Sequence, residues 1–212
     1  MLTTSLLLAA ASSSLELAPP AQASAPTTTS AFGYSFVQLG YARTDIDGFD
    51  DEADGLGVSV AYSVAPQVFV FAGLGFSTVG VYIIDLGTGD IVGEDDLEST
   101  TISAGVGFHH ALAPRTDFVA DVAIGRVEVD VDAIGYSDST TVWGVEAGIR
   151  HLVDEKFEVN GFLVLTDGSD IDSELGVALG GRFYATPQFS VGVGLGLFED
   201  SNSIGLNVRF QW

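Results

Sequence analysis

The sequence contains no cysteine and few basic residues. Only seven Lys and Arg stand against 29 Asp and Glu among its 212 residues, which gives a formal net charge of −22. Without Cys the chain has no disulfide, no thiol nucleophile and no Cys-based zinc site. So strong a negative charge repels nucleic-acid phosphates and excludes nucleic acid as a partner.

Long apolar runs and helical periodicity are also missing. Beyond the N-terminal segment no run reaches the roughly 18 apolar residues of a transmembrane helix. Yet apolar residues make up 47% of the chain, which excludes a disordered protein. The apolar residues must therefore be distributed in another pattern.

The first segment predicts a secretory signal. Its apolar stretch runs from Leu6 to Ala11, and Ala21 and Ala23 have the spacing of a cleavage site. We predict a signal peptide over residues 1–23, a short polar lead over 24–32 and one β domain over 33–212.

Alternation of apolar and polar residues dominates from Tyr34 onward and predicts ten strands. Strands of about ten residues have the length of tilted strands that cross a bilayer. The predicted strands are 33–46, 54–65, 68–80, 98–111, 117–132, 139–152, 156–167, 173–185, 188–198 and 203–212.

The connections alternate between two kinds. Tight turns such as "APQ" and "VDEK" follow every even-numbered strand, and acidic loops such as "DIDGFDDEAD" follow every odd-numbered strand. Short turns at one end and longer loops at the other are typical of outer-membrane barrels.

The two faces of the strands have inverted polarity. One face carries continuous rows such as Val191, Val193, Leu195 and Leu197, and the other carries mostly Gly and Ala with a few charges. A soluble barrel buries its apolar face, but this polar face has too few charges to form a solvated surface. We therefore predict that lipid contacts the apolar rows and that the Gly-rich rows line a lumen.

Strand 117–132 breaks this parity. Phe118, Val122 and Ile124 fall on one face, whereas the valines from Val127 onward fall on the other. A β-bulge near Gly125–Arg126 would return the valines to the lipid and point Arg126 and Glu128 into the lumen.

The closing stretch "SIGLNVRFQW" alternates to a terminal aromatic residue, Trp212. With the strand pattern over residues 33–212, it resembles the small outer-membrane β-barrels of the OmpA/OmpX-like, "porin family" kind. The resemblance implies an all-β, antiparallel, up-and-down transmembrane barrel in a bacterial outer membrane. The strand pattern of this sequence gives ten strands, and the eight strands of well-known relatives are the alternative. It also implies recognition of the last strand by the barrel-assembly machinery.

Charged residues in the predicted lumen form a candidate site. They have two interpretations, a structural salt-bridged filling of the barrel or a charged constriction that selects solutes. The predicted lumenal charge cluster is Asp121, Glu146, Arg150, Glu158, Arg182 and Arg209, and the predicted membrane-interface aromatics are Trp143, Phe210 and Trp212.

The loop acids also have two interpretations. One is a solvated, repulsive rim, and the other is binding of Ca²⁺ or Mg²⁺, which could bridge the loops to lipopolysaccharide phosphates. The candidate ligands are Asp45, Asp47, Asp50, Asp167, Asp170 and Asp172.

Catalytic groups are poorly placed for an enzyme. His109, His110 and His151 all lie beside short turns, away from the acidic loops, and no Ser and His coincide at the outer rim. We expect a non-enzymatic, monomeric barrel without a cofactor that contacts outer-membrane lipid and contributes to envelope integrity or surface interaction. The alternative is a narrow channel that favours cations because its mouth is acidic.

Overall fold

The computed structural model describes residues 30–48, 51–84, 91–169, 171 and 173–212. The predicted signal peptide lies outside the described residues, as does all but the end of the predicted polar lead. Among the described residues no helix is long and apolar enough to cross a membrane.

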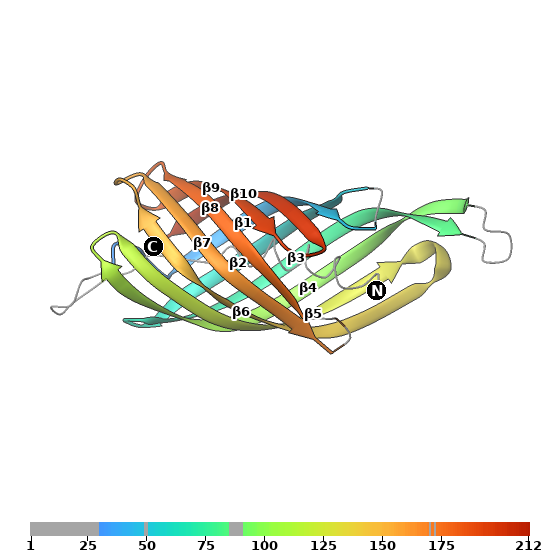
Figure 1. The fold of residues 1–212 in the computed structure, drawn as a ribbon, viewed down its shortest axis with the longest axis horizontal. Helices are drawn as coiled ribbons and strands as arrows, with labels where there is room; N and C mark the ends of the chain where they lie inside the picture. Colours follow the sequence, from blue (N-terminus) through green and yellow to red (C-terminus); the bar gives the residue numbers. More distant parts are fainter. Residues whose placement is uncertain (1–29, 49–50, 85–90, 170, 172) are drawn as a thin grey trace.

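The described chain forms one closed antiparallel sheet (Figure 1) in which each strand pairs with its neighbours in sequence. The prediction of ten strands is confirmed and the eight-strand alternative is wrong. A single 3-10 turn, η1 (Asp132–Ile134), precedes β6. The strands are β1 (Phe36–Ile46), β2 (Ala53–Ala65), β3 (Val68–Ile84), β4 (Ile91–Ala113), β5 (Thr116–Val131), β6 (Tyr136–Leu152), β7 (Phe157–Gly168), β8 (Glu174–Tyr184), β9 (Phe189–Leu197) and β10 (Ser201–Gln211).

The first and last strands close the barrel. β1 and β10 pair along their whole lengths, from Phe36 opposite Gln211 to Ile46 opposite Ser201. The amide of Trp212 then donates to the carbonyl of Ser35 at 3.2 Å, which extends the seam by one bond. Neither strand leaves a sheet edge open.

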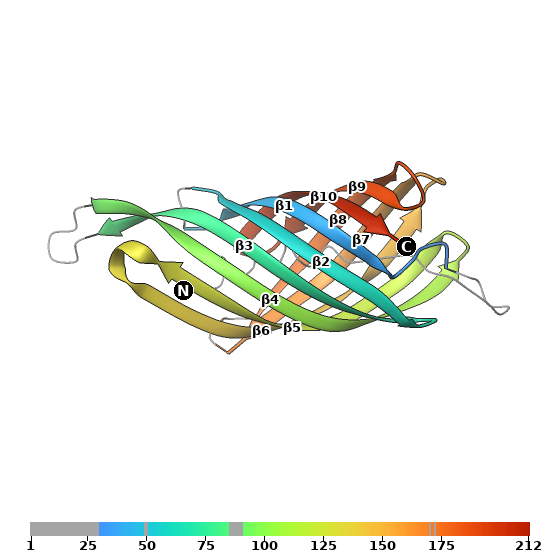
Figure 2. The ribbon, with the colours of Figure 1, turned by 180° about the vertical axis from the view of Figure 1, so that it is seen from behind.

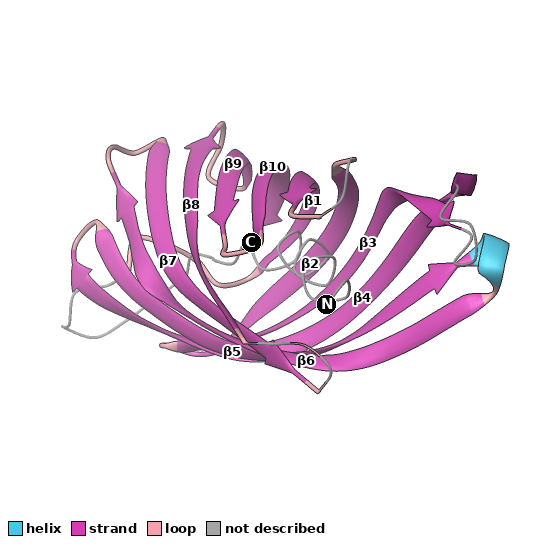
Figure 3. Ribbon diagram, turned by 45° about the vertical axis from the view of Figure 1, so that its right-hand side comes forward, coloured by secondary structure: helices cyan, strands magenta, loops and turns pink. Residues whose placement is uncertain are grey.

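The two ends of the barrel differ. The start of β1, the end of β10 and the turns after β2, β4, β6 and β8 lie at one end, here called the short-turn end, and the other end is the loop end. β3 to β6 continue well past the other strands at the loop end (Figures 1 and 3), and β4 reaches 23 residues. The segment predicted as a long acidic loop is therefore partly strand.

The outer face carries the apolar rows. Ile102, Leu163 and Leu175 are more than 60% exposed, whereas the charged Arg150 and Glu158 on the opposite face are 1% exposed. An apolar surface that surrounds a whole barrel requires lipid as its solvent. The strands therefore have the predicted inverted polarity, with apolar side chains outside and charged side chains inside.

The bulge predicted in β5 is wrong. β5 pairs with β6 in unbroken register from Thr116 to Val131, so the parity never changes. The side chains of Arg126 and Glu128 point outward and are more than half exposed, not into the lumen. Val127 and Val129 point inward and are buried.

On the outer face, contact with lipid ends at one level along the strands, and beyond that level the outer face contacts water. The lipid-facing zone is here called the belt. This change of surroundings explains why β5 needs no bulge. Along each strand toward the loop end, the last apolar side chain of the outer face gives way to a polar one, for example Tyr41 to Arg43, Ile124 to Arg126 and Trp143 to Thr141. Beyond this belt edge the outer face meets water and the inner face becomes apolar, as in a soluble β-protein. The inward Val127, Val129 and Val142 form one such apolar cluster.

Inside the belt, glycines accept the rings of neighbouring strands. Phe69 and Phe71 on β3 point inward, where their rings lie over Gly107 and Gly105 of β4. Phe162 of β7 lies over Gly148 of β6 in the same way. The lumenal glycines therefore make room for rings that fill the barrel.

Adding a side chain at one of the glycines that an aromatic ring covers should destabilise the barrel. A Cβ added at Gly107 would lie 2.0 Å from Cζ of Phe69, whose ring is fully buried and cannot move aside. We expect Gly107→Ala to lower the free energy of unfolding by about 1–3 kcal/mol, measured by denaturant unfolding in lipid vesicles.

Gly144→Ala is the matched control, since its new Cβ would meet its nearest atom at an ordinary 3.5 Å. Equal unfolding midpoints for the two variants would contradict the interpretation that Gly107 makes room for the ring of Phe69.

Candidate functional site

A buried ion pair lies near the short-turn end of the lumen. Arg150 of β6 donates from Nε and Nη2 to the two carboxylate oxygens of Glu158 on β7, at 2.9 and 2.6 Å. Both residues are 1% exposed. Two parallel bonds to a carboxylate fix the guanidinium in orientation as well as in position.

Two further arginines surround this pair. Arg182 of β8 faces Glu158 across the strands and donates to Gln38 and Ser190. Arg209 of β10 donates from Nε to the same Oε1 of Gln38, at 2.8 Å. The result is a layer of side chains from β6 to β10 and β1, here called the arginine layer: Gln38, Arg150, Glu158, Arg182, Tyr184, Ser190 and Arg209.

The structure does not bring all the predicted lumenal charges together. Asp121 and Glu146 are buried and lie opposite each other on β5 and β6. They are about four residues, or roughly 13 Å along the strands, from the level of Arg150. Neither carboxylate oxygen of Asp121 accepts a hydrogen bond within the described part of the chain.

The residues before β1 fold into the barrel at the same end. Phe32, Tyr34 and Phe36 are completely buried. Phe32 lies under the guanidinium of Arg150 at 4.4 Å, and Phe36 lies under that of Arg209 at 4.1 Å. Such cation–π contacts stabilise a positive charge that is removed from water.

Hydrogen bonds and ring stacking anchor this segment. Asp117 at the start of β5 accepts hydrogen bonds from the hydroxyls of Ser30 and Tyr34, at 2.5 and 3.3 Å. The ring of Tyr34 also stacks on His109, with centroids 3.5 Å apart, and on Phe69 at 4.8 Å. Residues 30–36 are here called the N-terminal plug.

Sequence reasoning missed the plug and Gln38, although the signal was present. Phe32, Tyr34, Phe36 and Gln38 occupy alternate positions in "FGYSFVQ". They therefore continue the inward parity of β1 back beyond its first residue. Of these residues only Phe32 falls in the predicted polar lead, whereas Tyr34, Phe36 and Gln38 fall in the predicted strand 33–46.

The predicted interface aromatics all face outward. Trp143 lies at the belt edge on β6 and is 41% exposed, while Phe210 and Trp212 lie at the short-turn end. The rings of the last two are 6.4 Å apart. Outer-membrane barrels carry aromatic side chains at both membrane interfaces, and the interface role of these three residues stays a prediction.

The metal candidates are only partly described. Asp45 and Asp47 are exposed at the loop end, and Asp167 accepts hydrogen bonds from the amide of Gly168 and the hydroxyl of Ser173. Asp50, Asp170 and Asp172 lie outside the described residues. Within the residues that the structure does describe, no three His, Asp or Glu side chains are grouped to hold a metal ion.

The comparisons with known proteins agree with this architecture. The sequence profile of the outer membrane protein beta-barrel domain matches residues 4–210, nearly the whole chain. The protein belongs to this family. As an outer-membrane barrel, it lies in the bacterial outer membrane. None of the curated proteins compared with it matches.

Several solved structures are similar to this chain at low identity. The NanC porin is 11% identical, with a TM-score of 0.51 over 83% of this chain and 100% of that one. The Neisserial surface protein A is 10% identical, with a TM-score of 0.42 over 84% and 96%. Ail of Yersinia pestis is 14% identical, with a TM-score of 0.37 over 84% and 97%. At 11% identity, the likeness to the NanC porin concerns the fold alone.

Membership of the family orients the barrel. Outer-membrane barrels place short turns in the periplasm and longer loops outside the cell. The arginine layer and the N-terminal plug therefore lie at the periplasmic mouth (Figure 2 shows the C-terminus there), and β3 to β6 extend from the outer leaflet toward the exterior.

Removing the acid that holds Arg150 by two hydrogen bonds should destabilise the outer-membrane barrel strongly. In Glu158→Gln, Arg150 loses its paired carboxylate and Arg182 loses the carboxylate opposite it, and Asp117 is the buried acid that remains opposite Arg150. We expect the free energy of unfolding to fall by about 3–5 kcal/mol, measured by denaturant titration in vesicles.

Asp54→Asn is the control for this variant. It removes the exposed ion pair with Arg43, which solvent screens, and its unfolding midpoint should stay almost unchanged. If both variants unfold at the wild-type denaturant concentration, the buried pair does not hold the layer together.

Proposed function

We propose that this outer-membrane barrel is non-enzymatic, that its lumen is closed at the periplasmic mouth, and that it contributes to envelope integrity or surface interaction. The observation that carries the proposal is the joint burial of the N-terminal plug and the arginine layer. A mouth occupied by packed rings and paired guanidinium groups leaves little room for hydrated solutes.

The arrangement around His109 argues against hydrolytic chemistry. Ser30, Asp117 and His109 lie together, which superficially suggests a catalytic triad. However, the Ser30 hydroxyl donates to Asp117 and not to the imidazole, so the serine–histidine hydrogen bond that activates the serine of a triad is not formed. The His109 ring is stacked on Tyr34 and is 2% exposed, which keeps substrates away.

The other histidines have structural partners at the same end. His110 lies 3.1 Å from the amide nitrogen of Gln67, and His151 lies 2.9 Å from the Thr116 hydroxyl. Both are outward-facing and exposed. Their position beside periplasmic turns supports a role at the membrane interface and not in chemistry on external substrates.

The partners follow from the same features. The sealed seam between β1 and β10 supports a monomer. The alternation of β10 up to Trp212 supports recognition by the barrel-assembly machinery, and the apolar belt supports outer-membrane lipid as the main contact. The acidic extracellular end would meet other molecules at the cell surface, directly or through divalent cations.

Planar-bilayer recordings separate the closed barrel from the alternative, a cation-favouring channel. We expect the wild-type protein to give a closed baseline. The double variant Phe32→Ala and Tyr34→Ala removes two rings of the plug and should produce transient openings, because Phe36 and the arginine layer then occupy the mouth without them.

The control is Phe157→Ala with Phe183→Ala, which removes two outward-facing rings that contact each other at 5.0 Å. It should remain closed. Stable, stepwise, cation-selective currents from the wild-type protein would overturn the proposal in favour of the channel.

A further inference from the structure

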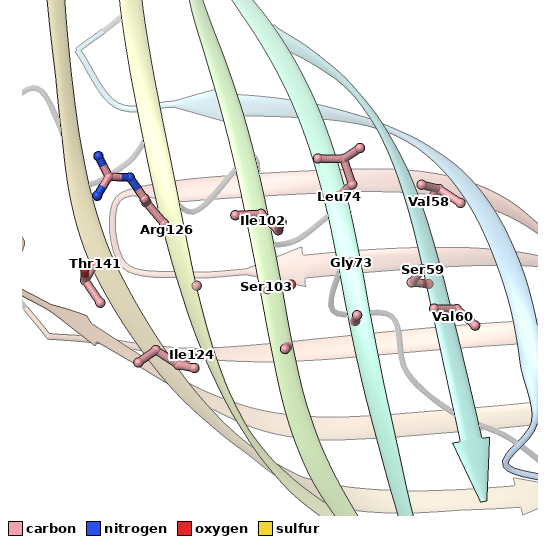
Figure 4. Close-up of a pocket in the computed structure, with 13 residues that line it drawn as sticks. Val58, Ser59, Val60, Gly73, Leu74, Ile102, Ser103, Ile124, Arg126 and Thr141 are labelled. Carbon is pink, nitrogen blue, oxygen red and sulfur yellow. The ribbon is translucent and has the colours of Figure 1, made fainter.

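The lipid-facing surface of β2 to β6 contains an apolar hollow of about 640 Å³. Figure 4 shows its labelled lining residues, with Val58, Val60 and Leu74 on one side, Ile102 near the centre and Ile124 and Arg126 on the other side. The hollow is shallow and open toward the surrounding lipid, and its lining is almost wholly apolar.

Two alanines create the hollow. Ala72 of β3 and Ala104 of β4 lie directly opposite each other and face outward. Their neighbours in the same row are the larger Val60 and Ile124. Ala120 and Ala147 form a second outward-facing pair on β5 and β6, but it is the hollow beside Ala72 and Ala104 that is lined down to the level of Gly73, Ser103 and Gly125.

Arg126 lies at the end of the hollow nearest the cell exterior. It is the first polar residue beyond Ile124 on β5, at the belt edge where outer-leaflet headgroups begin. Its Nη2 donates to Ser139 at 2.7 Å and its Nε to Glu128 at 3.1 Å. These two bonds hold the guanidinium beside the hollow.

We propose that the hollow holds an acyl chain of a phosphorylated outer-leaflet lipid and that Arg126 binds the phosphate of the same molecule. An apolar depression and a guanidinium at the headgroup level complement the two chemical parts of such a lipid. The inference rests on the position of the barrel in the outer membrane and is independent of the closed lumen.

Glu128 weakens the proposed contact between Arg126 and the lipid phosphate. Its carboxylate partly neutralises Arg126 and repels an approaching phosphate. Glu128→Gln should therefore tighten binding of a phosphorylated lipid, whereas Arg126→Gln should weaken it. The opposite effects of adjacent, equally exposed positions distinguish a phosphate contact from a general change in the surface.

Native mass spectrometry of the full barrel in detergent, titrated with diphosphoryl lipid A, tests the proposal. We expect Arg126→Gln to weaken lipid A binding by about tenfold, as for the loss of one charged hydrogen bond. Ala104→Leu fills the hollow with an equally apolar side chain and should weaken it to a similar extent. Lipid A without phosphates should bind the wild type as weakly as diphosphoryl lipid A binds Arg126→Gln.

Two control variants keep the experiment specific. Ala147→Leu enlarges an outward-facing alanine of β6 outside the hollow, and Arg43→Gln removes the arginine at the belt edge of β1, which Glu52 and Asp54 already pair. Both should bind lipid A like the wild type. The proposal would be overturned if wild type, Ala104→Leu and Arg126→Gln bound lipid A equally. It would also be overturned if Ala147→Leu weakened binding as much as Ala104→Leu. Neither outcome would affect the conductance prediction.

Discussion

Closure of the sheet on itself is the constraint on which the rest of the structure depends. Hydrocarbon offers no partner to a backbone amide, and each unpaired group there costs several kcal/mol. The full-length pairing of β1 with β10 removes the last open edge. Once the sheet is closed, every side chain points either to the surroundings or into a confined interior. The alternation of the sequence then determines which side chains face the surroundings and which face the interior.

The confined interior explains why glycines and aromatic rings occur together. Ten strands enclose more space than their own small side chains fill. The rings of Phe69 and Phe162 fill it by lying over glycines of neighbouring strands. At the periplasmic mouth rings also stabilise charge, because the three arginines of the layer outnumber the buried acids beside them, Glu158 and Asp117. The faces of Phe32 and Phe36 supply the partial negative charge that further acids would otherwise provide.

Much of the fold was predictable because alternation is a property of each strand. Strand number, order and inward parity follow from the sequence, and so does the lumenal position of Arg150, Glu158, Arg182 and Arg209. Two mistakes, the bulge in β5 and the loop before residue 98, share one physical cause. The rule that apolar residues face outward holds only while lipid is the solvent, so Arg126 and Glu128, beyond the belt edge, needed no bulge. For the same reason the acid-rich start of β4 resembled a loop, although it is a strand whose outer face contacts water. The lipid hollow was not predictable, because it depends on Ala72 and Ala104 meeting across two strands.

The charges of the barrel therefore fall into two groups with different energetics. Arg150 and Glu158 are removed from water, so each depends on the other, and their geometry is fixed. Arg43 and its acidic partners remain in water and are held only weakly. Arg126 is exposed and paired with Glu128 in the same way, but it also borders the apolar hollow, so its stem lies beside hydrocarbon while its guanidinium reaches the headgroup level. An arginine can bridge these two environments through its long apolar stem. At that level the surrounding phosphates are anionic, so a cation gains from its position where a carboxylate would be repelled.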